Sequence, residues 1–135
     1  MRINGQGSNW IRRSTRQAIY HRDGDRCVYC QRKVKHGRGT KGVWAAHLDH
    51  LHPQEFGGAS TADNLVTACA SCNAAKGSMS LRDFLRKLAA KSLKVTTPTA
   101  AQVKAFQKTL SHRIRTCITK PLDRVEGRRR ADAGM

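Results

Sequence analysis

The stretch LDHLHPQEFGGASTADNLVTACASCNAAKG, residues 48–77, decides the fold of this chain. It contains the acid–histidine pair Asp49-His50, a Gly-Gly turn, two asparagines at Asn64 and Asn73, and a C-x-x-C pair. A second C-x-x-C pair lies upstream of it. Because zinc sites bring such pairs together, we expect residues that are distant in the sequence to meet at this stretch.

Four of the five cysteines form the two C-x-x-C pairs, and these are Cys27, Cys30, Cys69 and Cys72. Structural zinc sites have four tetrahedral ligands, and a site of four thiolates leaves no position for a substrate. We therefore predict one structural Zn²⁺ held by the four cysteines. The alternatives are a redox C-x-x-C pair, which needs only one of the two pairs, and four thiols without a metal.

The composition limits both the core and the choice of partner. A chain of 135 residues with 5% aromatic and 39% hydrophobic residues buries a modest core, so a metal would help to stabilise it. A net charge of +17 opposes compaction and favours a polyanionic partner, although a solvated basic surface is the alternative. We see no basic amphipathic helix, lipid signal or transmembrane segment, so nucleic acid is a better partner than a membrane.

The N-terminal residues lack an apolar run long enough for a signal peptide. We therefore expect a cytoplasmic protein, in a bacterium or a phage-infected host cell. In a reducing cytoplasm, paired cysteines are metal ligands rather than disulfides.

Local patterns predict the secondary structure around the cysteine pairs. Ser14 and Gln17 have capping-box spacing, which predicts a helix from Ser14. Residues 43–50 and 65–68 read as two strands, followed by a helix that ends near Gly77. Two more helices are expected. The first begins at Ser80 and has four apolar residues on one face, namely Leu81, Phe84, Leu85 and Leu88. The second begins at Thr99, and its apolar stripe includes Cys117, which we expect to be a packed core residue. Residues 91–98 read as the linker between these two helices.

The order of RDGDRCVYC, LDHLHP, GG, DNLVTAC and SCNAAKG resembles the HNH endonuclease family. The resemblance covers residues 14–77 and implies an α+β fold with a small ββα-metal (treble-clef-like) core, stapled by the four-cysteine zinc site. A C-terminal helical extension follows this core. We divide the chain into a flexible basic arm (1–13), a nuclease domain (14–92), the helical extension (93–123) and a basic disordered tail (124–135).

The resemblance implies a role for each matching residue. His50 corresponds to the general base that activates water, and Asn64 to the residue that orients this base and braces the loop. Asp49 corresponds to a metal ligand, and so does Asn73, where the family name implies a histidine and a known variant has asparagine. Hard carboxylate and amide oxygens suit Mg²⁺ or Mn²⁺, and the pKa of histidine suits a base near neutral pH.

The two neighbours Asp49 and His50 present a geometric problem, because successive residues of a regular strand point to opposite faces. Both side chains reach one site only if the strand twists, bulges or ends there. By alternation, His47 lies on the side of Asp49. It is either a contact to metal or phosphate or a plain strand histidine.

We expect double-stranded DNA to be the substrate, cut with low sequence specificity by a monomer. The family resemblance implies that the products have 5′-phosphate and 3′-hydroxyl ends. Candidate contacts to nucleic acid are Lys76, Arg82, Arg12, Arg13 and Lys41, although a solvated basic surface is the alternative. Two other functions fit the sequence. One is a non-catalytic zinc module that binds nucleic acid, and the other is a phage-type nuclease subunit that needs a packaging or restriction partner docked on its C-terminal helices.

Overall fold

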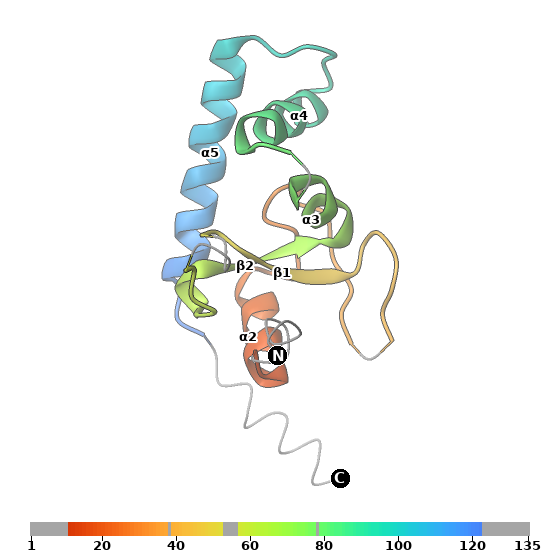
Figure 1. The fold of residues 1–135 in the computed structure, drawn as a ribbon, viewed down its shortest axis with the longest axis vertical. Helices are drawn as coiled ribbons and strands as arrows, with labels where there is room; N and C mark the ends of the chain where they lie inside the picture. Colours follow the sequence, from red (N-terminus) through yellow and green to blue (C-terminus); the bar gives the residue numbers. More distant parts are fainter. Residues whose placement is uncertain (1–10, 38, 53–56, 78, 123–135) are drawn as a thin grey trace, which may run out of the picture.

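A computed structural model describes residues 11–37, 39–52, 57–77 and 79–122 (Figure 1). Within these residues the chain forms four α-helices, one 3₁₀ helix and two β-strands. In chain order they are α2 (Arg13–Arg22), β1 (Ala46–His50), η2 (Ala62–Asn64), β2 (Leu65–Cys69), α3 (Ala70–Gly77), α4 (Leu81–Leu93) and α5 (Ala100–Thr119).

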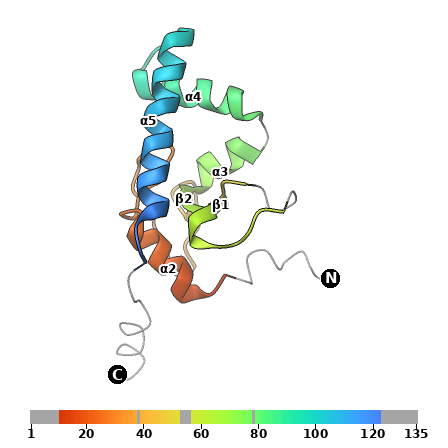
Figure 2. The ribbon, with the colours of Figure 1, turned by 90° about the vertical axis from the view of Figure 1, so that its left-hand side faces the viewer.

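The centre of the fold is a two-stranded antiparallel sheet. Its register runs from Ala46 opposite Cys69 to His50 opposite Leu65. Helix α3 begins where β2 ends and lies on one side of the sheet, whereas α2 lies on the other side (Figures 1 and 2). This β1–β2–α3 unit has the arrangement of the ββα-metal core, as the sequence predicts.

Strand β2 is buried along its whole length, because both faces of the sheet are covered. Val66 and Ala68 belong to a large apolar cluster with residues of α4 and α5. Leu65 belongs to a smaller cluster with Ile11 and Ile19. The sheet therefore separates two apolar layers, and β1 is held against a rigid partner strand.

Helices α4 and α5 complete the large cluster, and α5 runs along one side of the sheet unit (Figure 1). Ser80 caps α4 by accepting a hydrogen bond from the backbone of Asp83, and Thr99 forms a full capping box with Gln102. Cys117 packs against the cluster from α5. Helix α5, which falls within the predicted extension, thus shares a core with α4 and the β1–β2–α3 unit, while the proposed domain boundaries remain a prediction.

Two predicted starts of elements are wrong. Helix α2 begins at Arg13 after the N-cap residue Arg12, which makes no side-chain cap bond, and Ser14 is buried rather than capping. The first strand begins at Ala46 and not at residue 43, because a turn precedes it and the backbone of Ala45 bonds back to Gly42. The apolar side chain of Trp44 is partly exposed there and lies against the guanidinium of Arg32.

Two details of the C-terminal half also differ from the sequence patterns. Helix α4 extends into the expected linker as far as Leu93, where Lys94 adopts a left-handed conformation with φ of 58°. Leu81 lies at the first position of α4 and is 60% exposed, so it does not join Phe84 in the core. Residues 1–10 of the expected arm and the expected tail 124–135 lie outside the described residues. None of the described helices is both long enough and apolar enough to cross a membrane.

Candidate functional site

The four cysteines of the two C-x-x-C pairs meet in one cluster. Their sulfur atoms all lie within 4.8 Å of one another, and the Sγ atoms of Cys30 and Cys69 are 3.8 Å apart. A tetrahedral zinc with Zn–S bonds of about 2.3 Å separates its sulfur ligands by roughly 3.8 Å. The donors and their spacing therefore fit a structural zinc ion, which would join the turn at Cys27 to the junction of β2 and α3.

The surroundings of the cluster favour the thiolate form of Cys27. The backbone N–H groups of Cys30 and Cys72 point to the sulfurs of Cys27 and Cys69, at 3.5 and 3.3 Å. The pKa of Cys27 is lowered to about 5, first of all by the hydrogen bond from Cys72. The same bond is the main cause of the raised pKa of Cys72. The hydrogen bonds to Cys27 thus favour its thiolate, which is the form that binds a metal.

The Asp49 carboxylate lies between β1 and α3 and is nearly buried. Its Oδ2 accepts a hydrogen bond from the hydroxyl of Tyr29, and the ammonium of Lys76 lies 3.1 Å from the same atom. Burial and the negative charge of Asp49 raise the pKa of Tyr29, so the phenol remains a donor. The carboxylate is thus fixed from two sides, and Lys76 brings a positive charge to it.

Asn73 extends from α3 toward the same face of β1. Its amide nitrogen lies 3.1 Å from Nδ1 of His47. Because an amide nitrogen only donates, His47 accepts here with an unprotonated Nδ1, and the oxygen of Asn73 is not used in this bond. His47 and Asp49 therefore both face α3, and Asn73 and Lys76 lie one turn apart on that helix.

His50 is the last residue of β1, and its ring turns toward the loop that follows. Its Nε2 lies 2.9 Å from the hydroxyl of Ser60. Burial lowers the pKa of His50, the charge of Asp49 opposes this shift, and the charge of Lys76 adds to it. His50 therefore lies close enough to Asp49 and Lys76 for both charges to act on its imidazole.

Asn64 holds the two ends of the loop between β1 and β2 together. Its side-chain oxygen accepts from the backbone of His52 at 2.8 Å, and its amide donates to the carbonyls of His52 and Ala59 at 3.1 and 2.8 Å. The carbonyl of Asn64 also accepts from Leu51 at 2.9 Å. These bonds fix the backbone immediately after His50.

A buried ion pair, not identified from the sequence, supports this loop from α2. The side chain of Arg22 is fully buried, binds Asp23 at 2.7 Å, and donates to the carbonyls of Ala62 and Leu65 at 2.7 and 2.6 Å. Asp23 in turn accepts from the backbone of Thr67 at 2.9 Å. The pair thus holds both residues that flank the segment carrying Asn64. The only sign of this ion pair in the sequence was the RDG stretch that contains both residues. Contacts that span about forty residues produce no periodic pattern in a sequence.

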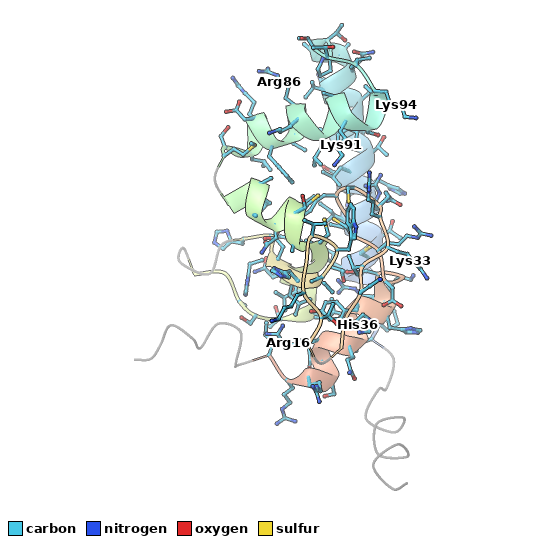
Figure 3. The ribbon with its side chains drawn as sticks, turned by 90° about the vertical axis from the view of Figure 1, so that its right-hand side faces the viewer. Arg16, Lys33, His36, Arg86, Lys91 and Lys94 are labelled. Carbon is cyan, nitrogen blue, oxygen red and sulfur yellow. The ribbon has the colours of Figure 1, made fainter. Side chains whose placement is uncertain are left out.

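The predicted contacts to nucleic acid lie at separate places. Arg12 and Arg13 are exposed at the start of α2, and Lys41 is exposed in the loop before β1. Arg82 lies beside the groove between α4 and α5, on the helix that also carries Arg86 (Figure 3). Lys76 is paired with Asp49 instead of extending freely into solvent.

One of three comparisons with known proteins found a match. Residues 27–79 match the model of a family described as HNH endonuclease, and the matched segment contains the four cysteines and the Asp49, His50, Asn64 and Asn73 set. No curated protein and no solved structure matched the chain.

Proposed function

We propose that the chain, whose residues 27–79 match the model of the HNH endonuclease family, is a metal-dependent endonuclease that hydrolyses phosphodiester bonds of DNA. One observation carries the proposal. The carboxylate of Asp49 and the amide of Asn73 lie on facing surfaces of β1 and α3, with His50 at the end of the same strand. A zinc module that only binds nucleic acid does not need Asp49, His50 and Asn73 in this arrangement beside its cysteines.

The donor set fits a hard divalent cation. Asp49 offers a carboxylate and Asn73 an amide oxygen, which are ligand types that Mg²⁺ and Mn²⁺ prefer. We propose that these two residues hold the ion together with water and phosphate oxygens. When bound, it would neutralise the charge that grows on the phosphate and on the leaving 3′ oxygen.

His50 is the proposed general base. If its Nε2–H donates to Ser60, then Nδ1 is the ring atom that accepts a proton from the attacking water. Asn64 acts as a positioning residue, because its bonds to His52 and Ala59 fix the backbone that follows His50. Lys76 is proposed to contact phosphate from its place beside Asp49.

The products would be 5′-phosphate and 3′-hydroxyl ends, and we propose low sequence specificity on double-stranded DNA. The charge of +17 supports a polyanionic substrate, because it raises the rate of encounter and the affinity at low salt. We also propose that the protein acts as a monomer.

The test is cleavage of supercoiled plasmid by zinc-loaded protein in Mg²⁺, in Mn²⁺ and without a divalent cation. The wild type is compared with His50→Ala and with His112→Ala, which removes an exposed histidine of α5 as a matched control. We expect nicked or linear DNA with the wild type and the control only when Mg²⁺ or Mn²⁺ is present. Binding without cleavage in every cation would support the non-catalytic module, and activity restored by a partner protein would identify a nuclease subunit.

A further inference from the structure

A basic cavity that the proposed chemistry does not use lies between α2 and the loop before β1. Its volume is about 260 Å³. Arg13, Arg16 and Tyr20 line it from α2, Lys35 and His36 line it from the loop, and His47 lines it from β1. Figure 3 shows Arg16 and His36 at the same end of the molecule, away from Arg86 and Lys91 on α4.

The side chains that line this cavity favour an anion. Three permanent cations and the titratable ring of His36 contribute to its wall, and none of the described residues that line it is acidic. The carboxylate of Asp25 lies outside the wall, 2.9 Å from His36. Positive side chains around a concave surface concentrate the field, so the cavity attracts a negative group more strongly than a flat basic surface does.

The wall is built on ordered elements. The buried ring of Tyr20 packs against His36 with centroids 4.9 Å apart, and its hydroxyl donates to the carbonyl of Ala46 at 3.4 Å. Arg16 donates to the carbonyl of Ile11 at 3.3 Å, which fixes its guanidinium on α2. At about 30 Å³ for each water molecule, the volume corresponds to roughly nine waters, which leaves room for a phosphate with its ester oxygens.

His47 connects the cavity with the candidate active site. It lines the cavity and also accepts the hydrogen bond from Asn73. Asp49 follows two residues later on β1, which is roughly 7 Å along the strand. Each nucleotide advances about 3.4 Å along the axis of a duplex and further along its own backbone, so this length corresponds to one or two nucleotides. A nucleic acid strand whose scissile phosphate lies at Asp49 would therefore reach the cavity within a few nucleotides.

We propose that this cavity binds a backbone phosphodiester of the nucleic acid strand, a few nucleotides from the scissile phosphate. The inference rests on the proposed nuclease function, because it takes the active site as the neighbouring contact. The proposed ligand is a phosphodiester of a polymer and not free phosphate. The reason is that His47 connects the cavity with the candidate active site, where the scissile phosphate of the same strand would bind. The cavity thereby fixes the strand in register for cleavage.

The test uses His50→Ala as the background, so that DNA stays intact. In this background the pair Arg13→Gln and Lys35→Gln removes two exposed charges from the cavity. The matched control, Arg86→Gln and Lys91→Gln, removes two exposed charges from α4. Fluorescence anisotropy with a labelled duplex, at several salt concentrations, measures the affinity of each protein.

We expect the cavity pair to weaken duplex binding on the order of tenfold, which corresponds to one charge-assisted contact. The slope of log affinity against log salt should become shallower by about 0.9, the value for one phosphate. The control pair should change both quantities by a clearly smaller amount. An equal loss with both pairs would overturn the inference, because it would mean that only the total charge matters.

A second measurement locates the ligand and separates the two sources of phosphate. NMR spectra of the ¹⁵N-labelled protein should show shifts of the Gly37 and Thr40 amides when a short duplex is added, and much smaller shifts with inorganic phosphate at equal ionic strength. Shifts that are as large with inorganic phosphate would overturn the assignment to a polymer. Neither readout requires cleavage, so an inactive wild type that still shows the cavity effect would reject the proposed function alone.

Discussion

Replacing Arg22 by methionine tests how the fold supports the loop around the candidate site. The guanidinium is fully buried and makes an ion pair with Asp23 and two hydrogen bonds, to the carbonyls of Ala62 and Leu65. Methionine has similar length and no donor. The change therefore leaves a buried carboxylate and two carbonyls without their partner, while the volume of the side chain is roughly kept.

The structure sets the size of the effect. Removing one member of a buried ion pair costs about 3–5 kcal/mol, because the other charge stays in a poorly solvated place. Solvent does not screen this pair, since the side chains of Arg22 and Asp23 are 0% and 1% exposed. At roughly 3–4 °C for each kcal/mol in a protein of this size, the melting temperature should fall by about 10–20 °C.

Differential scanning calorimetry of the zinc-loaded proteins measures this loss. The double variant Arg22→Met with Asp23→Asn should recover part of it, because the uncompensated charge is gone and an acceptor for Thr67 remains. The control Arg26→Met removes an exposed arginine and should stay within about 0.5 kcal/mol of the wild type. A drop of less than about 1 kcal/mol for Arg22→Met would refute the reasoning.

Three further predictions follow from the site. Removing zinc with a chelator, or replacing Cys72 by serine, should cost on the order of 10 kcal/mol and abolish the native circular dichroism, whereas a retained spectrum would show that the cluster does not stabilise the fold. Asn64→Ala should lower the unfolding free energy by roughly 1–3 kcal/mol and slow cleavage further than the stability loss explains, and kinetics as fast as wild type would exclude its positioning role. Asn73→His should move the metal preference from Mg²⁺ toward Ni²⁺ or Zn²⁺ in plasmid assays, because imidazole is a softer ligand than an amide oxygen, and an unchanged preference would argue against Asn73 as a ligand.

The sequence contained enough information for the centre of the fold. Two C-x-x-C pairs are typical of one shared tetrahedral zinc site, so their spacing predicted the cysteine cluster that the structure contains. The helix starts at Ser80 and Thr99 were also predicted correctly, because the capping bond that fixes each start joins residues only three positions apart. Strand β2 was predicted over residues 65–68, one residue short of its observed end at Cys69.

Other local patterns failed where tertiary contacts outweigh local preference. Ser14 has the spacing of a cap but is buried, so the helix begins one residue earlier. Trp44 looks like part of a strand, yet it lies in the turn before β1 and stacks with Arg32. Leu81 fits the apolar face of α4 by spacing, but the core does not reach the first turn of that helix.

In the candidate site, too, the residues that lie close together in the sequence were predicted, whereas the contacts between distant elements were not. The residues proposed for chemistry were found from their order along the chain, since they lie within thirty residues of one another. Their supports were not found from the sequence. Tyr29 reaches Asp49 from within the first C-x-x-C pair, and Arg22 reaches Leu65 of β2 from α2. These contacts depend on how elements pack, which sequence spacing does not encode.

The most direct test of the central claim is the single-turnover cleavage rate of a labelled DNA duplex in Mg²⁺, measured for the wild type, His50→Ala and His112→Ala at equal DNA occupancy. General base catalysis by a positioned side chain contributes about 10²- to 10⁴-fold, so His50→Ala should cut at least roughly a hundredfold more slowly. His112→Ala should cut at the wild-type rate. Cleavage by His50→Ala within a few fold of the wild type would contradict the account.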